Sequence, residues 1–166
     1  MTTLEELYRR YAPDVHRFVF WLSGDRHTAE DITSETFVRA WAGAEDLRME
    51  TVKAYLITIA RNLYLHQRRR SGRHTELDEA LVDPSPSPEA HAERREEWRT
   101  VRMALERLPE VDRAALLMRA DLDLPYEEIA RALGLSLSAA KVKVHRARLR
   151  MAAAREARGG SNEGDA

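Results

Sequence analysis

The chain of 166 residues contains no cysteine, which excludes disulfides, thiolate metal sites and thiol nucleophiles. Only seven glycines and 7% aromatic residues argue against a β-sandwich or a β-barrel. No apolar run approaches the length that crosses a bilayer, and the N-terminal segment MTTLEELYRR lacks the apolar core of a signal peptide. The remaining composition, 43% apolar and 33% charged, suits a soluble helical protein, which we expect to be cytoplasmic.

The formal net charge of −1 hides a strongly uneven distribution of charge along the chain. Residues 25–50 favour acidic side chains, 61–74 carry five arginines and no carboxylate, and 76–89 carry five carboxylates and no lysine or arginine. Residues 131–158 are basic, with Glu156 as the sole acid. This alternation indicates several surfaces for partners of different charge, although solvated helix faces would give the same pattern.

Helical spacing of apolar residues organises the first part of the chain. It predicts one helix from about Leu4 to Leu22, with Pro13 as a local irregularity and Ser23-Gly24-Asp25 as its end. A second helix is expected from about Thr28 to Trp41, and a third from Thr51 into HQRRRSGR. Together they predict a small helical domain over residues 1–72.

A change of composition follows this first domain. The segment DPSPSPEA contains three prolines in five residues, which predicts an extended acidic linker over 73–92. Helical spacing resumes near Ala90 and predicts a second domain over 93–155, followed by a disordered tail over 156–166. The predicted fold class is therefore all-α, with two small helical domains joined by a flexible linker.

The stretch YEEIARALGLSLSAAKVKVHRARLR predicts two helices around a tight turn. Gly134 can adopt positive φ and end the first helix, and Ser136 is placed to cap the second. On the second helix, small and apolar side chains form one stripe and cations lie outside it. Such a helix-turn-helix suits the DNA major groove, where phosphate contacts fix register and other side chains read bases. The alternative is an amphipathic helix whose basic face is merely solvated.

Two segments resemble one known family. ALERLPEVDRAALLMRADLDLPYEEIARALGLSLSAAKVKVHRARLRM resembles region four of the extracytoplasmic-function (ECF) sigma factors of bacterial RNA polymerase. AEDITSETFVRAW followed by AYLITIARNLYLHQRRR resembles region two of the same group, and the two segments come in the family's order. The resemblance implies an alternative sigma factor that binds core polymerase and recognises −10 and −35 promoter elements.

For the first domain, the resemblance implies contacts with the polymerase clamp helices and with −10 DNA. Polymerase-facing residues would be Asp31, Ser34 and Glu35, with Phe37 and Trp41 closer to the core. Two of these, Asp31 and Glu35, would alternatively serve only solubility. The implied −10 residues are Asp46, Leu47, Arg48, Tyr55, Arg61, Asn62, Arg68, Arg69 and Arg70. An aromatic at helical spacing such as Tyr55 would alternatively belong to the core.

For the second domain, the resemblance implies that the basic helix enters the −35 element. The implied base or near-base contacts are Lys141, Val142, His145 and Arg146, and the implied phosphate contacts are Lys143, Arg148 and Arg150. This chain departs from the family's pattern with Ser138-Ala139-Ala140, with Val142 and with Pro125. Linker carboxylates would occupy the RNA path, unless the linker is only a spacer; they are Glu76, Asp78, Glu79 and Asp83.

The expected partners are core RNA polymerase (the largest-subunit clamp helices and the second-largest-subunit flap), promoter DNA and an anti-sigma factor, with no membrane insertion. No catalytic residue, metal or cofactor is expected, and the chain is expected not to be an enzyme. One alternative is a stand-alone helix-turn-helix regulator, which normally acts as a dimer. A helical hydrolase or metalloenzyme is a weaker alternative, because the six histidines are dispersed without metal-ligand spacing.

Overall fold

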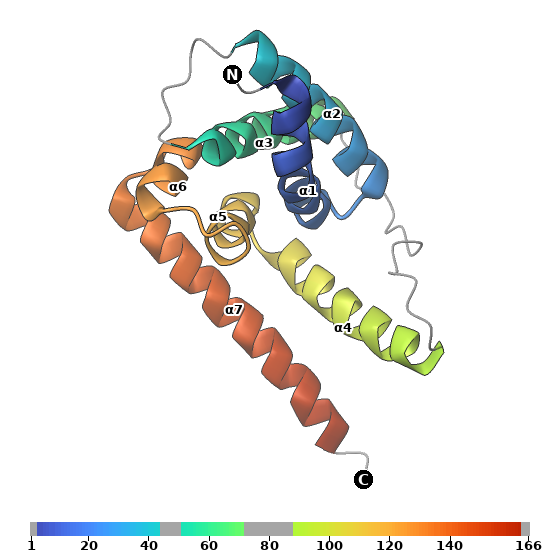
Figure 1. The fold of residues 1–166 in the computed structure, drawn as a ribbon. Helices are drawn as coiled ribbons and strands as arrows, with labels where there is room; N and C mark the ends of the chain where they lie inside the picture. Colours follow the sequence, from blue (N-terminus) through green and yellow to red (C-terminus); the bar gives the residue numbers. More distant parts are fainter. Residues whose placement is uncertain (1–2, 44–50, 72–87, 164–166) are drawn as a thin grey trace.

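The computed structural model describes residues 3–43, 51–71 and 88–163. All of the regular structure in these ranges is helical, as the sequence predicted (Figure 1). The seven helices are α1 (Leu4–Ser23), α2 (Arg26–Ala42), α3 (Val52–Ser71), α4 (Pro88–Arg107), α5 (Glu110–Ala120), α6 (Tyr126–Leu133) and α7 (Leu137–Glu163).

The hairpin of α1 and α2 is fixed by local hydrogen bonds at the helix ends. Thr3 and Glu6 form a reciprocal capping box at the start of α1, and Gly24 ends that helix with a φ of 74°. Asp25 then caps α2 through its carboxylate, which accepts from the backbone N–H of His27 and Thr28. The helix α3 packs on both α1 and α2, so the first predicted helical unit is present.

The second unit consists of α4 to α7, with α6 and α7 forming the helix-turn-helix. Gly134 ends α6 with a φ of 65°, a conformation that costs glycine little. The Ser136 hydroxyl accepts a hydrogen bond from Ala139 N at 3.1 Å, which confirms the predicted cap of α7. Pro125 precedes α6 and provides no side-chain cap.

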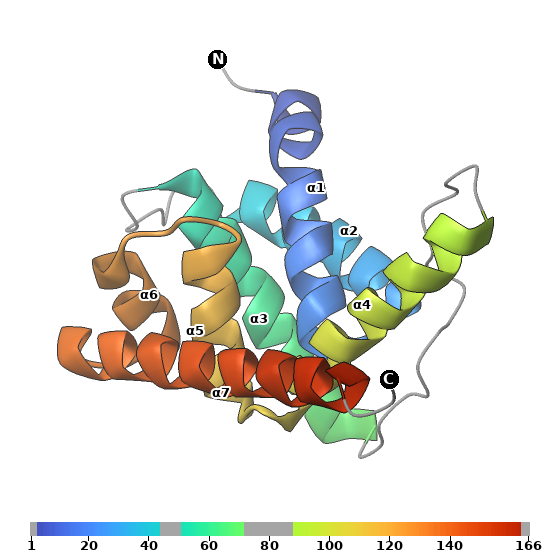
Figure 2. The same cartoon turned by 90° about the horizontal axis from the view of Figure 1, so that it is seen from below.

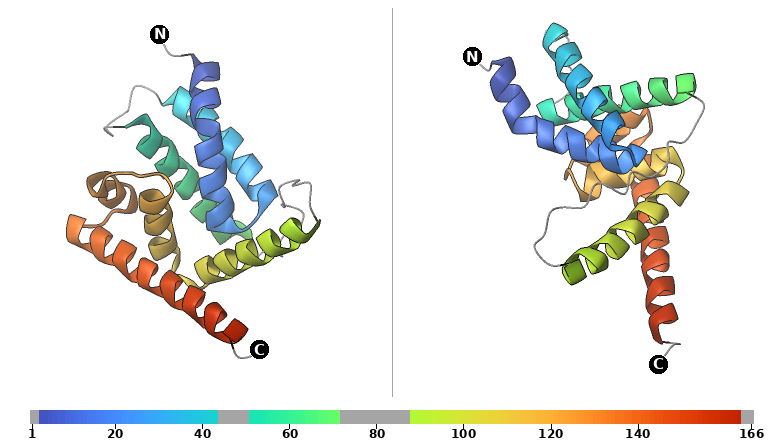
Figure 3. Two further views of the ribbon diagram at one scale, coloured as in Figure 1. Left: turned by 60° about the horizontal axis from the view of Figure 1, so that its bottom comes forward. Right: turned by 90° about the vertical axis from the view of Figure 1, so that its right-hand side faces the viewer.

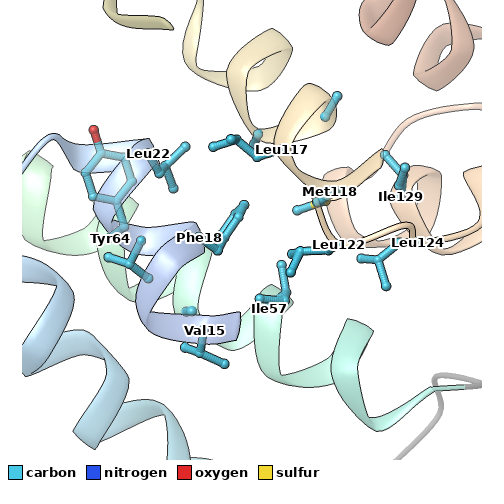
Figure 4. Packing of buried hydrophobic residues seen from close by; sticks show 14 of the residues in the cluster. Val15, Phe18, Leu22, Ile57, Tyr64, Leu117, Met118, Leu122, Leu124 and Ile129 are labelled. Carbon is cyan, nitrogen blue, oxygen red and sulfur yellow. The ribbon is translucent and has the colours of Figure 1, made fainter. Parts of the chain in front are cut away.

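The two units share one continuous apolar core. The helix α5 packs against α7 and α6 on one side and against α1 on the other, and α3 contacts α6 (Figure 2, Figure 3). Figure 4 shows Phe18 of α1, Ile57 of α3 and Met118 of α5 in one buried cluster. All three side chains are fully buried. The periodicity predicted each unit's apolar stripe, but not that the stripes would meet.

Two helix boundaries differ from the sequence expectation. The helix α7 continues to Glu163, which replaces the predicted disorder over 156–163. The segment MAAAREAR is rich in residues of high helix propensity, and Arg158 of α7 lies 3.8 Å from Glu96 of α4. The helix α4 begins at Pro88, inside the range predicted as linker. Proline suits the first turn of a helix because its missing N–H would be unsatisfied there.

The position of Trp41 differs from the sequence expectation, which placed this residue close to the core. Its side chain is 50% exposed, whereas Phe37 one turn earlier is 3% exposed and belongs to the core. Trp41 lies in the last turn of α2, which ends at Ala42, and the buried side of α2 ends at Ala40. The tryptophan therefore lies on the surface of this helix end.

Candidate polymerase and nucleic-acid surfaces

The outer face of α2 carries the three residues that the resemblance assigned to polymerase. Asp31, Ser34 and Glu35 are all exposed, while the opposite side of α2 is buried against α1 and α3. The carboxylate of Glu35 pairs with Arg39 one turn later, at 3.0 Å. Because exposed pairs of this kind are weak, Glu35 remains available to another cation.

The residues predicted to meet −10 DNA differ in their exposure to solvent. Asn62, Arg68, Arg69 and Arg70 are exposed on α3, as a DNA contact requires. Tyr55 is half-buried against the core, and its hydroxyl donates to the Gly43 carbonyl at 3.3 Å. This position is compatible both with a DNA contact and with a role in the core. The predicted contacts Asp46, Leu47 and Arg48 lie outside the described residues.

Arg61 is the exception among the predicted −10 contacts. It is 8% exposed and its guanidinium makes two hydrogen bonds to Glu110 of α5, Nε to Oε1 at 2.8 Å and NH2 to Oε2 at 2.7 Å. The side chains of both partners are about one-tenth exposed. The guanidinium of Arg61 is therefore bound to a carboxylate of the second unit and does not face solvent.

The start of α7 presents the predicted −35 surface. Ala140, Val144 and Ala147 are completely buried, as the predicted inward stripe requires, whereas Leu137, which helical spacing placed in the same stripe, is 39% exposed at the first turn of α7. Six of the seven predicted −35 residues are exposed on this helix, and Lys143 is partly exposed; the six are Lys141, Val142, His145, Arg146, Arg148 and Arg150. This arrangement orients α7 with its cations outward.

A buried carboxylate holds two of the predicted −35 residues. Asp112 of α5 is fully buried and accepts hydrogen bonds from Lys143 Nζ at 3.2 Å and from Arg146 Nε at 2.9 Å and NH2 at 3.1 Å. Burial alone would raise the pKa of Asp112, but the hydrogen bonds and charges of Arg146 and Lys143 lower it below the ordinary value. Asp112 therefore fixes α7 against α5.

Replacing Asp112 with asparagine is expected to destabilise the fold by about 1–3 kcal/mol at neutral pH, because the buried charge-assisted bonds are lost. Since the folded-state pKa of Asp112 is lowered, its contribution is complete above the unfolded pKa of about 3.9 and disappears as pH falls through the folded value. Urea unfolding at pH 7 and below pH 4 measures this. A difference between wild type and Asp112→Asn that stays constant with pH would contradict it.

The sequence did not identify the acidic residues of α5 as functional partners. Glu110 and Asp112 stand in the first turn of α5, where carboxylates are common for their interaction with the helix dipole. Their position therefore has a local explanation, and only the docking of α3 and α7 reveals their arginine partners. The linker acids Glu76, Asp78, Glu79 and Asp83 lie outside the described residues.

Other kinds of site receive no support within the described ranges. No group of three or more His, Asp or Glu side chains is arranged there to hold a metal ion. None of the helices there combines the length and apolarity that a membrane span requires.

Two known family models match the chain, one in each half. The family model for sigma-70 region 2 matches residues 7–74, and that for sigma-70 region 4 matches residues 98–151. The two matches leave out residues 1–6, 75–97 and 152–166, and they come in the order that the resemblance implied.

The individual proteins that this chain resembles are also sigma factors. The chain is 34% identical over 155 residues to the ECF RNA polymerase sigma factor SigE of Mycolicibacterium smegmatis, covering 89% of this chain and 60% of that one. It is 32% identical over 155 residues to the RNA polymerase sigma factor YlaC of Bacillus subtilis, covering 90% of each chain. The solved sigma factor RpoE from Bartonella quintana, in complex with the anti-sigma factor NepR, has a TM-score of 0.73 at 25% identity, over 92% of this chain and 96% of that chain.

These matches define a sigma factor fold with regions two and four. The chain belongs to the sigma-70 family, in its extracytoplasmic-function group.

Proposed function

We propose that this chain is an alternative sigma factor that binds core RNA polymerase and directs it to promoters with specific −10 and −35 elements. The match of both halves to two different sigma-70 regions, in order, carries this proposal. The chain supplies specificity, and the polymerase supplies the chemistry of RNA synthesis. It acts in the cytoplasm, where polymerase and DNA are present.

The proposed division of labour follows the exposed surfaces. Residues 1–72 bind the clamp helices through the acidic face of α2 and contact −10 DNA through α3. Residues 93–155 contact the polymerase flap and place α7 in the −35 major groove, and 73–92 connect the two. The face of α2 with Asp31 and Glu35 complements a basic partner, which raises association rate and specificity more than affinity.

Regulation by an anti-sigma factor is part of the proposal. The similar RpoE structure from Bartonella quintana is a complex with the anti-sigma factor NepR. A partner of this kind would act by covering the polymerase- and DNA-binding surfaces.

Transcription with purified core polymerase tests the function. We expect the full chain to give discrete RNA start sites on a genomic DNA library when no other specificity subunit is present, and sequencing the 5′ ends reports both promoter elements. Core polymerase alone is the control. A stand-alone helix-turn-helix regulator would protect DNA by itself and give no such starts, and that outcome would refute the proposal.

A further inference from the structure

The contact between Asp112 and Arg146 joins a buried group to a side chain that reaches the surface. Both carboxylate oxygens take part, Oδ2 accepting from Nε at 2.9 Å and Oδ1 from NH2 at 3.1 Å. Such a bidentate pair fixes the plane of the guanidinium as well as its position. The Asp112 side chain is completely buried, whereas that of Arg146 is 45% exposed. A fixed carboxylate of α5 therefore orients a surface arginine of α7.

The contact leaves part of the Arg146 guanidinium free. A guanidinium has five N–H donors in a planar fork, and Asp112 uses the Nε–H and one N–H of NH2. Within the part of the chain that the structure describes, NH1 has no hydrogen-bond partner. One N–H of NH1 and the second N–H of NH2 run parallel along the end of the group. These two donors are available to an acceptor outside the protein.

Two parallel donors of this kind suit one base edge in particular. Guanine presents its O6 and N7 acceptors side by side in the major groove, and a bidentate arginine is their commonest specific partner. Arg146 lies one turn after Val142 on the exposed part of α7, the helix that the proposed function places in that groove. The free end of Arg146 can therefore serve as a base reader.

Lys143 adds a second cation to the same carboxylate. Its Nζ donates to Asp112 Oδ1 at 3.2 Å, and its position three residues before Arg146 places it on the same side of α7. Two cations share one carboxylate, so this side of the helix keeps a net positive charge that attracts DNA. Asp112 thus orients Arg146 without cancelling the charge of the proposed −35 surface.

We propose that Asp112 is a positioning residue for −35 recognition, which holds Arg146 so that the free end of its guanidinium reads one guanine. The proposal rests on the proposed function of α7. Asp112 acts through Arg146 and is itself buried. An arginine that is already held loses less conformational freedom on binding and turns less easily toward another acceptor, so the effect is on discrimination between bases.

Discrimination is measured in the complex of the full chain with core polymerase. The probes are a promoter found by the transcription experiment and variants of it in which each −35 base pair is replaced in turn. In the wild type, replacing the guanine that Arg146 reads should weaken binding about 10- to 100-fold. Asp112→Asn should reduce that ratio about 3- to 10-fold, because asparagine turns a donor toward one of the arginine donors. Ratios at the other −35 positions should stay the same.

A ratio of affinities separates positioning from stability. Both DNAs bind the same folded molecules, so any folded fraction lost in Asp112→Asn cancels. Asp121→Asn is the matched control, because Asp121 also accepts two hydrogen bonds from an arginine Nε, but from Arg17 of α1; its ratios should equal those of the wild type. Arg146→Ala should remove discrimination at the same position, and adding Asp112→Asn should then change nothing further.

Equal loss of affinity for every promoter variant in Asp112→Asn, with all ratios unchanged, would overturn the proposal, because Arg146 would then contact only phosphate or act without Asp112. The same result for Arg146→Ala would overturn it as well.

Nuclear magnetic resonance of the free chain gives a measurement that needs no DNA. The Arg146 Nε–H signal, assigned by its absence in Arg146→Ala, should show restricted motion on the ps–ns timescale in the wild type and in Asp121→Asn, and increased motion in Asp112→Asn. Equal mobility in the wild type and Asp112→Asn would overturn the positioning role. Failure of the chain to direct any transcription would instead overturn the proposed function, and the Nε–H result would still decide whether Asp112 holds Arg146.

Discussion

Replacing Phe18 with alanine is expected to lower the free energy of unfolding by about 3–5 kcal/mol, the usual range for a buried phenylalanine. Phe18 is completely buried where α1, α3 and α5 meet. The cavity left behind would be bounded by side chains of both sigma regions, among them Ile57 and Met118. Because three helices border the site, none can close the cavity without disturbing its contacts with the other two.

Phe20→Ala is the matched control on the same helix. Phe20 is only partly buried and packs edge-on against Trp21 with ring centroids 5.3 Å apart, so its loss should cost well under half as much. Urea unfolding followed by circular dichroism measures both variants. Equal destabilisation by the two substitutions would show that Phe18 does not have the central position described here.

The shared core opposes separation of the two regions. Leu117, Met118 and Leu122 of the second unit are buried in the core cluster with residues of α1 and α3. Separation of the two regions would expose part of this apolar surface, which costs free energy in water.

The helices and their buried faces could be predicted because they depend on residues close in sequence. The stripe of Ala140, Val144 and Ala147 follows from helical spacing, and Gly134 and Ser136 mark the turn before it. The extension of α7 to Glu163 was missed because the glycines at 159 and 160 suggested a tail. A helix that is already formed tolerates them at a modest local cost.

The pairs that define the candidate site could not be predicted in the same way. Arg61 and Glu110 are 49 residues apart in sequence, and Asp112 and Arg146 are 34 apart. Each residue has a local explanation as part of a basic or an acidic helix turn. Their pairing depends on how complete helices pack, and the family resemblance describes the DNA-bound role of Arg61 rather than its partner in the free chain.

The exposed cations of α7 lead to the second large prediction. We expect the double variant Lys141→Glu with Arg148→Glu to weaken promoter binding by the polymerase complex about 100-fold or more, since each lost contact of this kind typically costs tenfold or more. Both side chains are exposed, so the fold should be preserved. Reversing the charges also places two carboxylates against DNA phosphates, which adds repulsion to the loss of contact.

Salt dependence shows whether the loss is electrostatic. The slope of log affinity against log salt should become shallower by about 2, one for each cation removed from the interface. Arg155→Glu is the matched control, because Arg155 lies on the same helix, is equally exposed and belongs to no proposed contact set. Polymerase binding without DNA should be unchanged in all three proteins. If Arg155→Glu weakens promoter binding as much as the double variant, α7 contributes only general positive charge and does not dock by its proposed surface.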